Sequence, residues 1–225
     1  MPDRPAPSGM TIQNKIALGL LAAAVLAVVV FMLITNNNND ASEAAASQDV
    51  EVILENSHRL SEAPNEKAVL VEFLDFECEA CLAAYPVVED LAAEYADELT
   101  IATRYFPLPG HPNSETAATA VEAAAQQGKF KEMHSLMYEK QTEWSHTAED
   151  RSPVFRTYAE QLGLDMNAYD ASVEDPATAS RIAQDKNDGL ALGVEGTPTF
   201  FLDGEMIQPA GEDELRQLIE AAINE

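Results

Sequence analysis

The sequence predicts an α/β fold in which a strand–helix–strand unit and a strand–strand–helix unit are separated by a long helical insertion. In the first unit, residues 68–75 form a dense apolar run with β-branched side chains, a pattern typical of a buried strand. A helical pattern follows from Cys81 to about Tyr95, and residues 99–106 predict the next strand. Because a helix joins the two strands, we expect them to be parallel.

The C-terminal part of the chain returns to strand patterning. Residues 199–202 and 205–208 flank Asp203-Gly204, a dipeptide that strongly favours a two-residue hairpin turn, and residues 211–223 predict an amphipathic closing helix. Between the two units we expect a helical insertion over about residues 112–191. Its predicted helices cover residues 112–127, 130–144, 152–162, 166–172 and 176–191.

A long uncharged segment lies near the N-terminus. Residues 16–34 are 19 consecutive uncharged residues, enough to cross a hydrocarbon core of about 30 Å as a helix. Arg4 and Lys15 precede this segment, which predicts that residues 1–15 are cytoplasmic and that the remainder crosses the membrane. A cleaved signal peptide is the alternative, although its apolar region is usually only about 7–15 residues long.

The segment after the predicted transmembrane helix is polar. Residues 35–48 have no apolar periodicity and predict a flexible linker. We therefore expect residues 49–225 to form one extracytoplasmic domain, tethered to the cell membrane by a single-pass helix. Disulfides persist in that compartment.

Charge and cysteine content exclude several classes of protein. The chain has 225 residues, 13 basic and 39 acidic side chains, and a formal net charge of -26. Such a chain is not expected to bind nucleic acid, because phosphate contacts need clustered Lys and Arg. Two cysteines are too few for a disulfide scaffold or a four-cysteine zinc site.

These two cysteines, Cys78 and Cys81, lie three residues apart where the first strand meets its helix. Residues i and i+3 share one helix face, so their sulfurs can form a disulfide with little backbone movement. The first helical turn would stabilise a thiolate at Cys78, and the thiolate is the attacking form. Cys81, one turn further along, is suited to resolving a mixed disulfide. A C-x-x-C beside this strand–helix–strand pattern indicates redox chemistry.

Two other interpretations of the pair are open. A structural disulfide is one, but so short a loop would contribute little stability. A metal site is the other, but the four histidines, His58, His111, His134 and His146, have no common ligand spacing. We expect His111 to shape the loop before Pro112, and no bound metal or organic cofactor is expected.

A proline lies at the start of the late strand. Pro198 follows Thr197 directly before the predicted strand 199–202, where a residue without an N–H is tolerated. The Thr197-Pro198 bond is therefore a candidate cis peptide bond. The combination of strand, C-x-x-C, helix and distant Thr-Pro is much more specific than either motif alone.

Several stretches closely resemble the DsbA-like branch of the thioredoxin superfamily. The resemblance covers roughly residues 50–222 and implies a thioredoxin fold with an inserted α-helical subdomain, preceded here by one transmembrane helix. An anchored arrangement of this kind is similar to that of Gram-positive bacteria. The stretches are 72–81 (EFLDFECEAC), 105–112 (YFPLPGHP), 127–134 (QGKFKEMH), 141–144 (QTEW) and 193–200 (GVEGTPTF).

The resemblance implies a role for each matching residue. Cys78 corresponds to the exposed nucleophilic cysteine and Cys81 to the resolving cysteine. Thr197 and Pro198 correspond to the cis-proline loop, whose backbone pairs with the substrate peptide as an added strand. Glu72 corresponds to a buried acid that assists proton movement at the second cysteine, unless it is a simple surface acid.

The dipeptide inside the motif departs from the family pattern. Strong oxidants of the family usually have a histidine there, whereas this chain has Glu79-Ala80. A carboxylate about 6 Å from the sulfur, at an effective dielectric constant of about 40, would disfavour the thiolate by roughly 1.4 kcal/mol. With Asp75 and Glu77 also nearby, Glu79 and Ala80 are expected to tune the pair toward a more reducing potential.

We conclude from the sequence that this is an extracytoplasmic thiol-disulfide oxidoreductase that introduces disulfides into exported proteins through Cys78-Glu79-Ala80-Cys81. The redox-active disulfide itself carries the electrons. The implied partners are exported client proteins with reduced cysteines and a quinone-linked membrane oxidase of the DsbB or VKOR type that recycles the enzyme. We expect a monomer.

Two alternatives remain open at this stage. One is a membrane-tethered reductase, for example in cytochrome maturation, and the other is a non-catalytic peptide-binding or chaperone module on the same fold. An exposed Trp144 near the cysteines would bind substrate, whereas a Trp144 that caps the helical insertion would not.

Overall fold

A computed structural model describes residues 50–224 of the chain. The chain divides into two units, residues 1–49 and 50–225. The predictions for residues 1–15, 16–34 and 35–48 concern residues outside the described part. Within residues 50–224, no helix is both long and apolar enough to cross a membrane.

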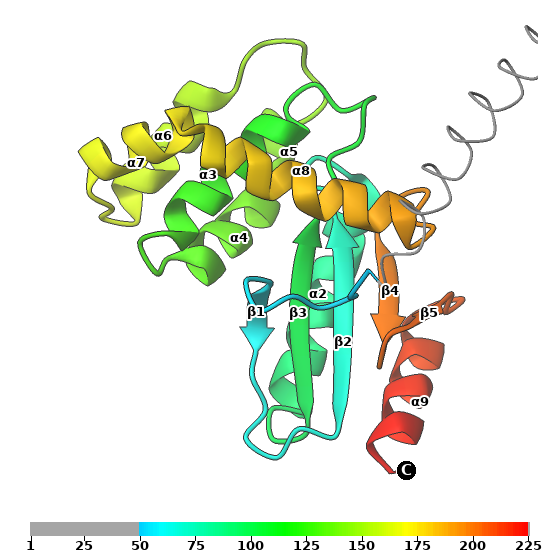
Figure 1. The fold of residues 1–225 in the computed structure, drawn as a ribbon. Helices are drawn as coiled ribbons and strands as arrows, with labels where there is room; N and C mark the ends of the chain where they lie inside the picture. The colour runs from blue at the N-terminus through cyan, green and yellow to red at the C-terminus, as the bar shows by residue number, and fades with distance from the viewer. Residues whose placement is uncertain (1–49, 225) are drawn as a thin grey trace, which may run out of the picture. The chain divides into compact units, whose positions relative to one another are not determined.

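The second unit contains the predicted order of strands and helices (Figure 1). The strand–helix–strand unit is β2 (Ala68–Leu74), α2 (Glu79–Glu94) and β3 (Leu99–Tyr105), and the strand–strand–helix unit is β4 (Thr199–Leu202), β5 (Glu205–Ile207) and α9 (Glu212–Ile223). The insertion consists of α3 (Ser114–Ala125), α4 (Phe130–Glu139), α5 (Gln141–Trp144), α6 (Ser152–Gln161), α7 (Met166–Glu174) and α8 (Pro176–Ala191). The thioredoxin fold with a helical insertion is thereby confirmed for the described residues.

The sheet has the strand order β1-β3-β2-β4-β5. As predicted, β2 and β3 are parallel, and the remaining neighbours are antiparallel. The sequence analysis missed the edge strand β1 (His58–Ser61), because its four residues show no continuous apolar run. Figure 1 shows the helical insertion at the end of the sheet toward which β2 and β3 point.

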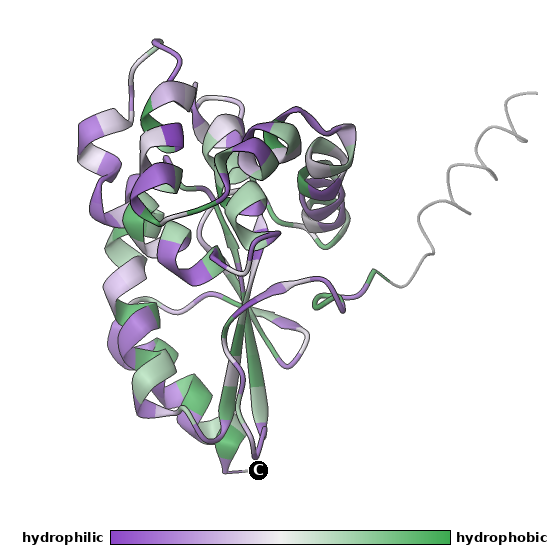
Figure 2. Ribbon diagram, turned by 90° about the vertical axis from the view of Figure 1, so that its left-hand side faces the viewer, coloured by the Kyte–Doolittle hydropathy of each residue, from purple (hydrophilic) through white to green (hydrophobic). Residues whose placement is uncertain are grey.

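The central strands have buried side chains on both faces, and on one face Val71, Phe73 and Ala102 pack with residues that include Val52 and Ile53 from the start of the described chain. β2 and β3 are almost entirely buried, which explains why they appear in the sequence as dense runs without alternation. Figure 2 shows these strands as largely hydrophobic and the helices as mixed, with hydrophilic outer faces. The core thus lies between the sheet and its covering helices.

One predicted helix is broken in the structure. We expected a single helix over residues 130–144, but α4 ends at Glu139 and α5 begins at Gln141. Trp144 is fully buried, donates from Nε1 to the carbonyl oxygen of Met137 (3.2 Å) and packs edge-on against Phe155. It therefore belongs to the core of the insertion, and of the two interpretations of Trp144 the exposed, substrate-binding one is wrong.

A buried arginine joins the sheet to the insertion. Arg104 on β3 donates from Nε to Oδ1 of Asp185 (2.7 Å) and forms an ion pair with Asp188, both on α8. Its Nη1 also donates to the carbonyl oxygen of Glu51 (2.9 Å). Because a charge buried without partners is very costly, this arrangement fixes α8 against β3.

The closest packing between α8 and the sheet is at Gly189. A methyl group added there would lie 2.8 Å from a ring carbon of Phe106 and 3.0 Å from one of Phe73. Because overpacking a dense core costs about 1–3 kcal/mol, we expect Gly189→Ala to lower the free energy of unfolding by that amount. Urea denaturation checks this. The exposed Ala191→Ser serves as a control on the same helix, and an unchanged unfolding midpoint for Gly189→Ala would contradict the packing.

Candidate active site

The cysteine pair lies where β2 ends and α2 begins. Cys78 is the residue that precedes the helix, with extended backbone angles (φ -77°, ψ 124°), so its side chain lies beside the N–H groups of the first turn. Cys81 follows one turn later and is completely buried, and both cysteines are free thiols in this structure. Cys78 is only 7% exposed, which is less than the resemblance implied.

The pairing of β4 with β2 brings a distant loop to the same place. The two strands are antiparallel with Phe73 opposite Thr199, so Pro198 lies at the point where β2 leads into the cysteine turn. The Thr197-Pro198 peptide bond is cis. Sγ of Cys78 lies 3.3 Å from the carbonyl oxygen of Thr197, to which it donates when it is protonated.

The two thiols have opposite ionisation behaviour. A hydrogen bond from Cys81 lowers the pKa of Cys78 to about 5, against the opposing effect of burial; the Thr197 side chain and the backbone N–H groups of Ala80 and Cys81 contribute as well. Burial raises the pKa of Cys81 well above its ordinary value, and its hydrogen bond to Cys78 and the Glu72 charge add to this. At neutral pH Cys78 is therefore a thiolate and Cys81 a thiol.

Glu72 lies on β2 behind this pair and is only 3% exposed, so it is not a surface acid. Burial raises the pKa of Glu72 to about 8, and the charge of Cys78 contributes to the rise. A carboxyl group with this pKa is mostly protonated at pH 7 and can both give and take a proton there.

Asp75 and Glu77 are arranged differently from the sequence-based expectation. Both are buried, and both accept hydrogen bonds from backbone N–H groups. Asp75 also contacts Nδ1 of His111 (2.7 Å). Neither acid is among the main causes of the pKa shift of Cys78. Their role as destabilisers of the thiolate is therefore not supported, since their charges are compensated by their own partners.

Gln141 is a site residue to which the sequence analysis gave no role. Its buried Nε2 donates to the carbonyl oxygens of Phe76 (2.8 Å) and Cys78 (2.9 Å), so α5 holds the cysteine turn. The break between α4 and α5 allows this side chain to reach the turn. The signal was present in the stretch 141–144, which resembles the family, but the sequence alone does not show what the glutamine contacts.

Comparison with known proteins identifies the family. A family model described as Thioredoxin matches residues 61–221. The chain belongs to this thioredoxin family.

Several solved structures have the same fold as this thioredoxin-family protein. It superposes on a thioredoxin-like oxidoreductase from Silicibacter pomeroyi with a TM-score of 0.66 and 26% identity, covering 80% of this chain and 99% of the other. BdbD from Bacillus subtilis gives a TM-score of 0.67 at 18% identity (78% and 97% covered). The thiol-disulfide exchange protein α-DsbA2 from Wolbachia pipientis gives a TM-score of 0.64 at 21% identity, covering 83% of this chain and 97% of the other. The chain thus shares the fold of DsbA-like proteins, and the family model together with the first of these structures confirms its resemblance to thioredoxin-like oxidoreductases.

Curated relatives in sequence are much longer proteins. The chain is 41% identical over 143 residues to a Na⁺/H⁺ antiporter NhaA of Salinispora tropica, covering 63% of this chain and 21% of the relative. An NhaA antiporter of Herminiimonas arsenicoxydans is 37% identical over 139 residues (62% and 21%). The chain therefore spans only about a fifth of the length of these relatives.

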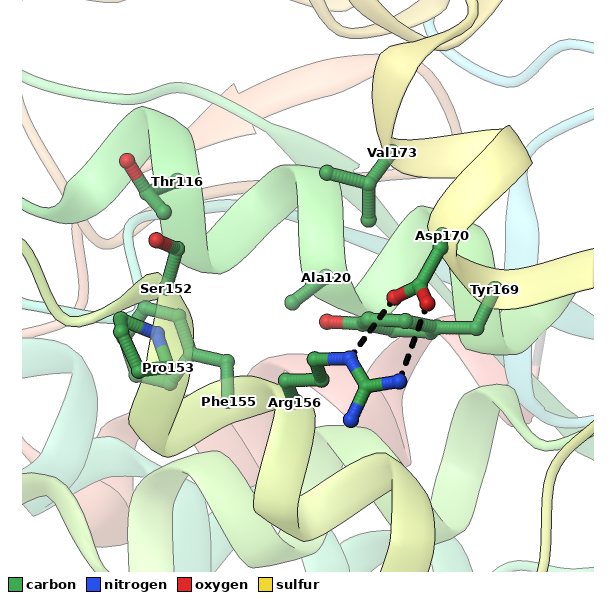
Figure 3. A pocket seen from close by; sticks show the side chains of 9 residues that line it. All are labelled: Thr116, Ala120, Ser152, Pro153, Phe155, Arg156, Tyr169, Asp170 and Val173. Carbon is green, nitrogen blue, oxygen red and sulfur yellow. Dashed lines mark hydrogen bonds and ion pairs between the residues drawn. The ribbon is translucent and has the colours of Figure 1, made fainter. Parts of the chain in front are cut away.

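A cavity of this thioredoxin-family protein lies within the helical insertion, away from the cysteines. It has a volume of about 270 Å³ and is bordered by α3, α6 and α7 (Figure 3). Its arginine, Arg156, is bound by Asp170 through two hydrogen bonds of 2.8 and 3.0 Å. The cavity therefore offers no free charge to an ionic ligand.

The described residues contain no group of three or more His, Cys, Asp or Glu side chains arranged to hold a metal ion. The four histidines have separate surroundings. His134 is buried among aromatic rings, and burial lowers its pKa to about 3, with a small effect of the His58 charge. His58 contacts Glu122, whereas His111 and His146 lie near the cysteine turn.

Proposed function

We propose that the protein is a membrane-tethered, extracytoplasmic thiol-disulfide oxidoreductase that introduces disulfides into exported proteins. The observation that carries the proposal is the opposite ionisation of the two thiols in one C-x-x-C beside a cis-proline. A stabilised Cys78 thiolate favours the reduced enzyme. Electrons therefore flow from the client to the enzyme.

In the proposed reaction the oxidised enzyme carries a disulfide between Cys78 and Cys81. A client thiolate attacks Sγ of Cys78, a mixed disulfide forms, and Cys81 leaves as a thiolate. Cys81 then takes a proton, for which the buried Glu72, with a pKa of about 8, is the donor. A second client thiolate attacks the client sulfur of the mixed disulfide, and Cys78 leaves as a thiolate. The client loses two electrons and the enzyme gains them.

The surroundings of Pro198 suit an extended client peptide. A groove of about 360 Å³ beside it is lined by residues of β4, β5 and the segment that follows β5. The carbonyl oxygen of Thr197 lies 3.3 Å from Sγ of Cys78, so a peptide bound along Thr197 and Pro198 would carry its cysteine to the nucleophile. We assign client binding to these two residues.

The proposed location rests on the sequence before residue 50. The basic residues before the uncharged segment 16–34 favour a cytoplasmic N-terminus and an exported domain. The antiporter relatives join a similar domain to a membrane protein, which agrees with membrane attachment. A quinone-linked membrane oxidase of the DsbB or VKOR type is the proposed partner that reoxidises Cys78 and Cys81.

The reduction potential distinguishes the proposed oxidase from a reductase. We expect the purified protein, equilibrated against glutathione buffers and analysed by thiol alkylation, to have a potential of about -120 to -180 mV, as in known disulfide donors. The reason is that a thiolate with a pKa near 5 stabilises the reduced form. A potential of about -250 mV or lower would instead support a reductase.

A further inference from the structure

Two histidines from the helical part of the chain lie beside the cysteine turn. His111 follows β3, and its Nδ1 contacts Oδ2 of Asp75 (2.7 Å), whose side chain is fully buried. The backbone carbonyl of Asp75 accepts the N–H of Cys78 (3.2 Å). His111 is thus attached through one residue to the turn that carries the nucleophile.

The second histidine, His146, lies in the loop between α5 and α6. Its backbone has a positive φ of 55°, which is uncommon for a residue other than glycine, and its N–H donates to Glu77 (2.7 Å). Its ring meets the ring of His111 edge-on at 5.9 Å, and its Nε2 lies 3.0 Å from a carboxylate oxygen of Glu79. A conformation held in this way indicates that the position of His146 matters to the site.

The charged groups around His111 are mostly negative. Asp75 and Glu77 contribute two negative charges from the turn, the Cys78 thiolate and Glu79 contribute two more from the start of α2, and His146 faces them from the α5–α6 loop. Asp75 and Glu77 are occupied by hydrogen bonds, and Glu79 has His146 as a partner. The imidazolium of His111 pairs with Asp75 (Nδ1 to Oδ2, 2.7 Å) and so offsets the negative charge of the residue whose backbone carbonyl holds the N–H of Cys78.

We propose that His111 is a positioning residue that sets the ionisation and the reduction potential of Cys78 from outside the C-x-x-C segment, while His146 contacts the carboxylate of Glu79. This inference rests on the proposed function, and it assigns to two distant loops the role that a histidine inside the motif would have. In the disulfide form Cys78 is neutral, and after the uptake of two electrons it is a thiolate. A positive charge on His111 stabilises only the reduced form.

The interaction makes the site dependent on pH. Burial lowers the pKa of His111, but its hydrogen bond to Asp75 and the charges of Asp75, Cys78 and Glu77 outweigh burial, so the pKa lies above its usual value. Below that pKa His111 is charged and favours the thiolate. Above it the stabilisation is lost.

The first test replaces His111 by glutamine. The substitution leaves Asp75 without its cationic partner, so we expect His111→Gln to raise the pKa of the Cys78 thiol by about one unit, a tenfold change in the stability of the thiolate. At about pH 6 the reduction potential should fall by about 30 mV, and at about pH 9 it should equal that of the native protein. His58→Gln is the matched control. His58 lies on the edge strand β1 and contacts Glu122 on α3, so its replacement should change neither value.

A reduction potential that is lowered at both pH values, or an unchanged thiol titration in His111→Gln, would overturn the proposal. The second test needs no substitution of His111. Coupling between two sites is reciprocal, so the pKa of His111 in the reduced protein, measured by NMR, must fall when Cys78→Ser removes the thiolate. An unchanged His111 pKa would refute the proposal even if exchange activity is intact. If the native protein has no exchange activity but the His111 pKa shifts in Cys78→Ser, the proposed function alone is refuted.

Discussion

Replacing Cys81 by serine is expected to turn the protein into a covalent trap for its clients. The serine hydroxyl can replace the hydrogen bond that Cys81 gives to Cys78, so the Cys78 thiolate remains reactive at neutral pH and attacks client disulfides. Without the thiol of Cys81, nothing within the enzyme resolves the mixed disulfide, which accumulates while turnover falls to the uncatalysed background. Non-reducing electrophoresis after acid quenching measures the trapped species.

Cys78→Ser is the matched control for this trap. The remaining Cys81 is completely buried, and burial keeps its pKa well above the ordinary value, so we expect neither trapping nor turnover. Equal amounts of mixed disulfide in the two variants would contradict the assignment of Cys78 as the nucleophile. A double variant that still protects clients from aggregation would support the chaperone alternative.

Replacing Glu72 by glutamine is expected to stabilise the reduced protein in mildly alkaline solution. The pKa of Glu72 is raised from 4.5 to about 8 by burial and by the Cys78 charge. The unfolded chain loses this proton above about pH 4.5 and the folded protein keeps it to about pH 8, so the native carboxyl lowers stability progressively across that range. At about pH 8.5 the gain in Glu72→Gln is at most about 5 kcal/mol, and at about pH 4 it is near zero.

Urea denaturation at the two pH values, under reducing conditions, checks this expectation. Glu122 provides a control of opposite sign, because its hydrogen bond to His58 outweighs burial and lowers its pKa. Its contribution to stability is present above about pH 4.5 and is lost on acidification, so Glu122→Gln should weaken the protein most near neutral pH. A Glu72→Gln variant that is less stable at alkaline pH would show that the fold favours the ionised carboxylate, so that the pKa of Glu72 is lowered and not raised.

Proton transfer to and from Cys81 is expected to be slower in Glu72→Gln. Glutamine keeps the shape of the side chain but cannot donate or accept the proton that Cys81 needs when its sulfur leaves. A more stable but slower enzyme would show that the buried acid is retained for the reaction and not for the fold.

Local patterns made the frame and the reactive pair predictable. The apolar run of β2, the C-x-x-C at the start of α2 and the Thr-Pro before β4 are all contiguous signals, and each lies where it was expected. The short edge strand β1 and the break at Lys140 were missed, because each depends on pairing or side-chain contacts with residues far away in the chain.

The electrostatics of the site were the least predictable part. From the sequence, Asp75 and Glu77 are simply two carboxylates beside a thiol. In the structure, Leu108, Asn113 and His146 bind them through backbone N–H groups that lie more than thirty positions away. No spacing rule identifies such partners, which are brought together only by the folded insertion.

The two hydrogen bonds of Glu77 have a consequence for how the molecule opens. Its carboxylate holds the chain at Asn113 (2.6 Å) and at His146 (2.7 Å), and so closes the segment 113–146 into a loop, as a cross-link would. Closing a loop of this length removes conformational entropy from partly opened states. We therefore expect helices α3, α4 and α5 to unfold as one cooperative unit with the cysteine turn, and the amide protons of Asn113 and His146 to exchange with solvent together.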